Sequence, residues 1–181
     1  MNRRSNLYKL LITAILLALG MVLPFLTGQI PAIGQAISPL HTPAFIAGLT
    51  CGWGWGLALG VILPLLRSVV FGMPPLVAVA IPMAFELAAY AAVSALCYGA
   101  LRRKMKNFPA ILLSMIISMV AGRILGGAAK AIVMGITGSG FTFAMFISSY
   151  FVTTAIGALI HLILVPAIVL ALEKAHLSPN H

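Results

Sequence analysis

Four ionisable side chains stand inside long apolar stretches of the sequence, where charge is uncommon. These residues are Arg67, Glu86, Arg123 and Lys130. A charged side chain in the middle of a bilayer costs on the order of a few kcal/mol, so such residues usually pair with one another or line a solute pathway. Three cations against one acid leave positive charge without an acidic partner, which favours binding of an anionic or acceptor-rich solute. Structural ion pairs between helices are the alternative interpretation.

The composition indicates that lipid surrounds most of this chain. Hydrophobic residues make up 62% of its 181 residues and charged residues only 7%, which is too little charge for the surface of a soluble domain. Inside hydrocarbon, only helices and closed β-barrels satisfy every backbone polar group, and the apolar segments lack the alternating pattern of barrel strands. We therefore predict an all-α membrane protein with a single domain over residues 1–181.

The apolar runs predict a bundle of six transmembrane helices. Their approximate ranges are 7–26, 41–53, 55–71, 77–101, 109–135 and 143–172. The second and third helices come from one apolar run, which could also form one long tilted helix. Glycine and tryptophan at residues 52–56 are compatible with a break, and the distribution of basic residues decides for two helices. The segment of residues 28–35 is long for a tight turn, and we expect it to fold back as a lid or re-entrant loop.

Basic residues set the orientation of these helices. Eight of the eleven Lys and Arg residues flank helix ends, and four of the eight form one connector. These four are Arg102, Arg103, Lys104 and Lys106. Basic loops remain in the cytoplasm, so the connector and the basic N-terminal tail share one side, which requires an even number of crossings between them. Both termini are therefore expected in the cytoplasm. The net charge of +9 is then explained by basic residues that face anionic lipid headgroups. It does not indicate binding of nucleic acid.

This orientation places the four intramembrane charges in the outer half of the bilayer. At 1.5 Å of rise per residue, Glu86 lies about 12 Å and Lys130 about 8 Å below the outer ends of their helices, and Arg123 lies near the midplane. Arg123 and Lys130 are seven residues apart and share a helix face. We predict that these residues line an outward-open polar cavity, completed by Tyr150 on the last helix. Arg67, about 6 Å below its helix end, is the expected partner of Glu86, although it would equally snorkel to the interface.

Small residues recur at helical spacing and predict close helix packing. Glycines occur every four residues over residues 48–60, and Gly122 and Gly126 repeat the spacing. Ala14 and Ala18 form a similar pair on the first helix. Because that helix carries no charge to face a cavity, it would dock on a partner helix as readily as on its own bundle.

The sequence contains no motif for ATP hydrolysis or metal binding. It has no G-x-x-x-x-G-K-[ST] phosphate loop, and its cytoplasmic segments are too short for a nucleotide-binding domain, so ATP-driven work must come from a partner. Cys51 and Cys97 fall in apolar stretches without matching histidines, which predicts neither a disulfide nor a metal site. No cofactor is expected.

Two other functions are compatible with the residues alone. Glu86 is an intramembrane acid, which would suit a stand-alone proton-coupled carrier of small solutes. Ser139 and His161 are the residue types of a hydrolase dyad, although His161 lies roughly 27 Å further along the last helix. That depth puts His161 in the inner half, away from the charged cluster, where we expect a hydrogen bond to a neighbouring helix.

Three segments carry a resemblance to a known family. They are His41 to Gly52, Pro64 to Pro74 and Met83 to Tyr90. Together with the six predicted helices, the alanine pair on the first helix, the long first outer loop and the polar outer cavity, they resemble the substrate-binding S component of an energy-coupling factor (ECF) vitamin transporter. The segments are similar to the pantothenate and pyridoxine-like branch of Gram-positive bacteria.

The resemblance implies a carrier in the plasma membrane that captures a vitamin from outside the cell. It then associates with a transmembrane coupling subunit and two ATPase subunits, so the chain itself is not expected to be an enzyme. Ala14 and Ala18 match the family motif that contacts the coupling subunit. The family builds its pocket from the first outer loop and helices 4 to 6, which agrees with Glu86, Arg123 and Lys130. Pantothenate is the first expected solute, followed by pyridoxine-type vitamins and cobalamin.

Overall fold

The computed structural model describes residues 3–27, 30, 34 and 36–179 of the chain. Within these ranges the chain forms helices joined by connections, and no strand is present. Five helical segments of the described residues are long and apolar enough to cross a membrane. They are Arg4–Leu26, Trp53–Phe71, Leu76–Leu101, Asn107–Ile136 and Phe143–Lys174. The all-helical membrane class predicted from the composition is confirmed.

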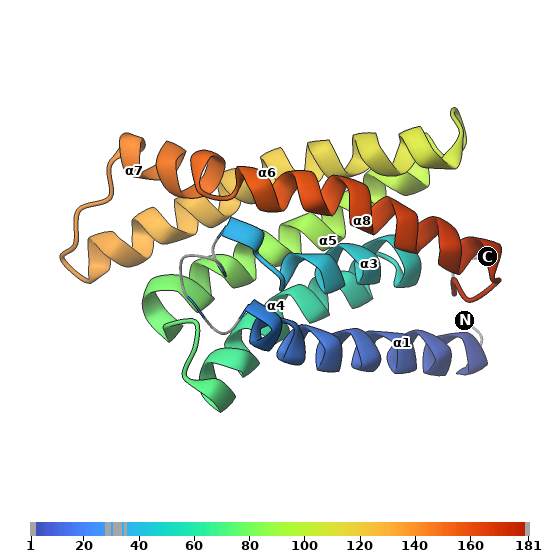
Figure 1. Cartoon of the computed structure of the whole chain (residues 1–181), viewed down its shortest axis with the longest axis horizontal. Helices are drawn as coiled ribbons and strands as arrows, with labels where there is room; N and C mark the ends of the chain where they lie inside the picture. Colours follow the sequence, from blue (N-terminus) through green and yellow to red (C-terminus); the bar gives the residue numbers. More distant parts are fainter. Residues whose placement is uncertain (1–2, 28–29, 31–33, 35, 180–181) are drawn as a thin grey trace.

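The first span consists of helix α1 (Arg3–Val22) and the short 3-10 helix η1 (Leu23–Thr27). The α-helix ends just before Pro24, whose nitrogen cannot donate the next helical hydrogen bond. Figure 1 shows α1 along one side of the bundle. Many of its apolar side chains are exposed on the surface of the chain, among them Leu11, Ile15 and Leu19.

The divided apolar run forms helices α3 (His41–Cys51) and α4 (Trp53–Phe71). Gly52 separates them with a φ of 99°, which favours glycine, so the predicted break is present. All residues of α3 are buried, but its 11 residues extend only about 17 Å, roughly half of a hydrocarbon core of about 30 Å. The predicted second helix is therefore too short to cross by itself. The chain reaches this helix through the buried residues 38–40.

The remaining spans are longer and less regular than predicted. The π-helical turn η2 (Leu76–Ala80) leads into α5 (Ile81–Leu101), and the basic connector leads into α6 (Asn107–Ile136). The last span combines α7 (Phe143–Ile147), a second π-helical turn η3 (Ser148–Val152) and α8 (Ala155–Lys174). Both π-helical turns lie where the candidate site forms, as is common for this geometry.

Helices α3, α4 and α5 approach closely through the glycines of residues 48–60. A Cβ atom at Gly48 would overlap the backbone of Ala91 on α5. A Cβ atom at Gly56 would lie 2.6 Å from the Cα atom of Gly48, and one at Gly60 would lie 2.6 Å from the nitrogen of Ala88. The close packing predicted for this stripe is confirmed.

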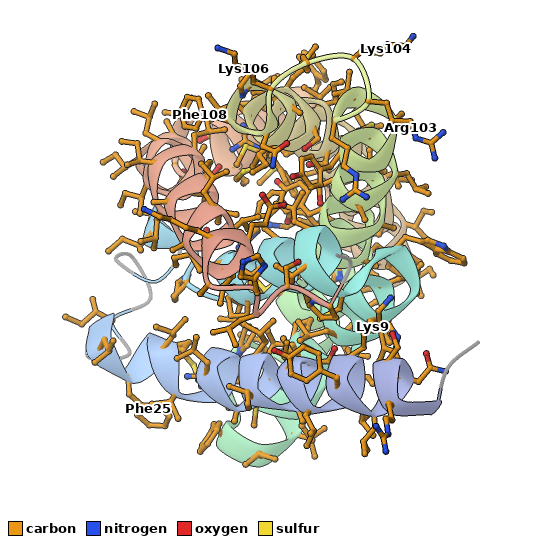
Figure 2. The ribbon with its side chains drawn as sticks, turned by 90° about the vertical axis from the view of Figure 1, so that its right-hand side faces the viewer. Lys9, Phe25, Arg103, Lys104, Lys106 and Phe108 are labelled. Atoms are coloured by element: carbon orange, nitrogen blue, oxygen red, sulfur yellow. The ribbon has the colours of Figure 1, made fainter. Side chains whose placement is uncertain are left out.

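The start of α1, the end of α8 and the connector between α5 and α6 lie at the same end of the long axis (Figure 1). The Tyr8 hydroxyl donates to the carbonyl of Leu177 at 2.9 Å. The carboxylate of Glu173 accepts from the Tyr98 hydroxyl at 2.6 Å and from the Asn107 amide at 2.9 Å. Figure 2 views the molecule from this end and shows the connector residues Arg103, Lys104 and Lys106 pointing outward from the bundle.

Candidate functional site

A polar cavity lies where the segment before α3, η2, α5, α6 and η3 meet. This cavity, the outer chamber, has a volume of about 140 Å³. It brings together three of the predicted site residues, Glu86, Lys130 and Tyr150. The other lining residues are Ser38, His41, Ala78, Val79, Pro82, Met83, Ser149, Thr153 and Thr154.

A second, smaller cavity adjoins the outer chamber. This inner recess has a volume of about 10 Å³, close to the space that one water molecule needs. Four residues line both cavities. They are Ser38, His41, Glu86 and Thr154. The recess adds the predicted site residue Arg123, together with Tyr90, Met119, Ala158 and His161. Glu86 therefore stands at the boundary between the two cavities.

Glu86 is buried, but its carboxylate has partners. Oxygen Oε1 accepts a hydrogen bond from the Tyr90 hydroxyl at 2.7 Å and lies 3.7 Å from Nε2 of His41. Tyr90 follows Glu86 by four residues on α5, so one helix face presents both side chains. The negative charge of the site is thus held from α5 and from the first turn of α3.

His41 and His161 stack their imidazole rings at a centroid distance of 5.6 Å, with 25° between the ring planes. Nδ1 of His41 lies 3.0 Å from the carbonyl oxygen of Ser38, and this nitrogen carries the hydrogen because a carbonyl oxygen only accepts. Both imidazoles are buried. They form the wall of the recess between α3 and α8.

The prediction that His161 lies away from the charged cluster is wrong. His161 lines the recess together with Glu86 and Arg123. The last span has 32 residues, or about 48 Å at 1.5 Å per residue, which exceeds a hydrocarbon core of about 30 Å. Counting depth from the first residue of this span therefore placed His161 too far toward the inner side.

Arg123 is held by two contacts from the last span. Its Nη2 atom donates to the Thr154 hydroxyl at 3.3 Å, and the guanidinium lies 4.9 Å from the centre of the Phe151 ring. Thr154 in turn donates to the carbonyl of Tyr150 at 2.6 Å, so its hydroxyl oxygen is free to accept from Arg123. The Nε atom of Arg123 is buried and has no hydrogen-bond partner among the described residues.

Lys130 supplies the positive charge of the outer chamber. Its Nζ atom lies 5.6 Å from the centre of the Phe141 ring and 6.0 Å from that of Tyr150. Within the described part of the chain, no ion pair joins Lys130 to an acidic side chain. Arg123 and Lys130 share a face of α6 as predicted, but the first borders the recess and the second borders the chamber.

Arg67 lies apart from this group, and its expected pairing with Glu86 is not formed. Its Nη1 atom donates to the carbonyl of Met21, and its guanidinium lies 5.2 Å and 5.1 Å from the ring centres of Phe25 and Phe71. The pairing was expected from depth alone, and depth does not say which way a side chain points. Arg67 faces the end of α1, and neither the outer chamber nor the inner recess includes it.

Glycines on two helices make room for the site. A Cβ atom at Gly126 of α6 would lie 2.8 Å from Cβ of Glu86, and one at Gly122 would overlap the Tyr90 ring. On α8, a Cβ atom at Gly157 would lie 2.5 Å from the carbonyl oxygen of Ala36. These glycines therefore leave room for Glu86 and Tyr90 of α5 and for the segment that carries Ser38.

Sequence reasoning assigned no site role to His41, Tyr90 or Thr154. Tyr90 carried a usable signal, because polar residues four apart on an apolar helix share a face. His41 had none, since only the entry of residues 38–40 into the bundle brings it to Glu86. Thr154 follows a π-helical turn, which shifts the helix face in a way that regular spacing does not reveal.

Ser139 and His161 do not form a dyad in the structure. Ser139 is exposed in the turn after α6, whereas His161 is buried in the recess. Among the described residues, no group of three or more His, Cys, Asp or Glu side chains is arranged to hold a metal ion.

Comparison with known proteins identifies one family. The family model described as the substrate-specific component of ECF transporters matches residues 8–169, a range that includes every residue of the chamber and the recess. No curated protein matches the chain, and no solved structure matches it.

Proposed function

The chain belongs to the family of ECF transporter substrate-specific components, and from this premise we propose that it captures a water-soluble vitamin from outside the cell for import. Members of this family are substrate-binding transporter subunits and not enzymes. The proposed binding site is the outer chamber with the inner recess, lined by Glu86, Lys130, Tyr150 and Arg123.

The charge arrangement of the chamber carries the proposal for the solute. Glu86 has Tyr90 and His41 as partners, whereas Lys130 has no acidic partner among the described residues. An anionic group of the solute would supply the missing partner of Lys130. The carboxylate of pantothenate makes this vitamin the first candidate, and pyridoxine-type vitamins come next. A chamber of about 140 Å³ is small for cobalamin.

The proposed threading has six crossings and cytoplasmic termini. The buried residues 38–40 and α3 together would form the second crossing, because α3 alone is about 17 Å long. With that crossing, the ends of the chain and the basic connector share one side, in agreement with their positions in Figure 1. The positive-inside rule makes this side the cytoplasm, and we place the protein in the plasma membrane of a Gram-positive bacterium.

The proposed partners are the transmembrane coupling subunit and two ATPase subunits of an ECF module. Ala14 and Ala18 are exposed on α1, so a partner helix could approach α1 closely at these residues. The flanking Ile15 and Leu19 are 66% and 44% exposed, which gives this face an apolar surface suited to another membrane helix.

A vitamin panel tests the proposal directly. The purified chain in detergent is expected to gain thermal stability with pantothenate or pyridoxine, because a ligand that binds only the folded state stabilises it. Isothermal titration calorimetry then gives the dissociation constant for each vitamin. The proposal is overturned if no vitamin of the panel binds the folded protein.

A stand-alone proton-coupled carrier is the second candidate, favoured by the 3.7 Å contact between Glu86 and His41. Both groups can exchange protons, and a solute bound beside them could be coupled to that exchange. Uptake assays in cells without ECF coupling and ATPase subunits separate the two functions. Uptake that persists there and stops with a protonophore would favour the carrier.

A further inference from the structure

Arg123, which lines the inner recess, has an unused hydrogen-bond donor. Nε of Arg123 is buried and has no partner among the described residues. An unpaired buried donor of a charged group is uncommon and destabilising, and usually marks a bound water or ligand. The Nη2 atom of the same guanidinium, in contrast, donates a hydrogen bond to the Thr154 hydroxyl.

The orientation of the guanidinium is fixed by its surroundings. Phe151 lies against it at 4.9 Å, and the Thr154 hydroxyl can only accept from Arg123, since its own hydrogen is donated to Tyr150. Arg123 therefore cannot turn Nε toward Thr154 without losing the existing contact. In this arrangement Nε has no partner among the described residues.

The recess itself admits very little. Its volume of about 10 Å³ accommodates one water or one small group. Arg123 presents only donors, and the hydrogen on Nδ1 of His41 is committed to Ser38. An atom that complements Arg123 here must be a hydrogen-bond acceptor, so an oxygen atom fits and a methyl group does not.

We propose that one acceptor oxygen of the solute enters the recess and accepts a hydrogen bond from Nε of Arg123, while its anionic group remains in the outer chamber near Lys130. This inference rests on the proposed function and narrows it. The solute is then a small anion with a separate hydroxyl or carbonyl oxygen. His41 and His161 act as specificity-determining residues, because their stacked rings limit the recess to one atom.

The experiment is a double-mutant cycle in which one change removes the Arg123 side chain and the other removes one hydroxyl group of the solute. The probe is pantothenate, compared with analogues that lack a single hydroxyl group. Each compound is titrated calorimetrically against the wild type and Arg123→Gln. We expect that removal of one particular hydroxyl group weakens binding to the wild type at least about tenfold. The same removal should change the affinity of Arg123→Gln little. Arg123→Lys is a second variant in case Arg123→Gln does not fold.

Arg102→Gln is the matched control, since it removes the same charge from an exposed residue of the connector. Its affinities for pantothenate and for each analogue should stay within about twofold of those of the wild type. If pantothenate binds but every hydroxyl loss is equal in the wild type and in the Arg123 variants, the recess has no role and the vitamin-binding function stands. If pantothenate does not bind the wild type while another vitamin of the panel does, only this inference falls. If no vitamin of the panel binds, both proposals fall.

Discussion

Gly126 on α6 faces Glu86 on α5 so closely that a Cβ atom added to the glycine would lie 2.8 Å from the Cβ atom of Glu86. The same added atom would lie 3.3 Å from the Tyr150 ring. A glycine that sequence reasoning assigned to helix packing therefore also determines where the only acid of the site can stand. The binding site and the helix interface depend on the same residue.

Gly126→Ala is expected to weaken vitamin binding by displacing Glu86. Overpacking of this kind costs about 1–3 kcal/mol, and part of that cost falls on the site because Glu86 must shift from Tyr90 and His41. Titration calorimetry of the folded variant measures the effect. Gly135→Ala on the same helix is the control, since no atom lies within 4 Å of its added Cβ. Equal affinity in both variants would contradict the prediction.

Lys130→Gln should weaken binding of pantothenate about tenfold or more, because a hydrogen bond between charged groups contributes about 1.5–3 kcal/mol. Pantothenol, in which an alcohol replaces the carboxylate, should bind the wild type and the variant equally. The exposed Lys104→Gln is the control for charge. A parallel loss for both compounds would mean that Lys130 does not contact the anionic group.

Gly157→Ala is expected to displace the segment that carries Ser38 from α8. The added Cβ would lie 2.5 Å from the carbonyl oxygen of Ala36 and 2.7 Å from that of Ile37, and backbone atoms cannot yield as a flexible side chain can. Vitamin dissociation, measured by stopped-flow dilution, should become faster. Gly99→Ala has no atom within 4 Å and should retain the wild-type rate; an unchanged rate in Gly157→Ala would count against this role of the segment.

Arg67→Met should lower thermal stability while leaving vitamin affinity unchanged. Arg67 is 2% exposed, and the substitution removes its hydrogen bond to Met21 and its contacts with two phenylalanine rings, together worth about 2–4 kcal/mol. Unfolding in detergent and calorimetric binding are measured on the same preparation. Arg102→Met is the control. Lower vitamin affinity at unchanged thermal stability would contradict this prediction and would indicate that Arg67 contributes to the binding site.

Ala14→Leu combined with Ala18→Leu should abolish ATP-dependent uptake and spare vitamin binding. Both alanines are exposed on α1, so leucine fits the free chain but keeps a partner helix at a distance. Uptake is measured in cells that express the complete ECF module, and binding is measured on the purified chain. Ala155→Leu, exposed on α8, is the control. Loss of uptake and binding together would indicate misfolding and not a docking face.

The sequence by itself determined the class of the protein and much of its helical layout. A low charge content excludes a soluble surface, and the break at Gly52 follows from the conformation that glycine permits. Depth along the helices was also sufficient to bring Glu86, Lys130 and Tyr150 to one cavity, because charge is tolerated only where a polar space receives it. The alanine pair on α1 was visible as spacing alone.

The tertiary structure decided which side chains face one another. Depth is a single coordinate along a helix, whereas contact also requires the direction of each side chain and the identity of the neighbouring helix. Arg67 has a suitable depth but points toward the end of α1, and His161 was placed too deep because its span is longer than the bilayer is thick. His41 reaches Glu86 only because the chain enters the bundle before α3. That entry depends on Gly157, whose missing side chain leaves room for the backbone of residues 36–37.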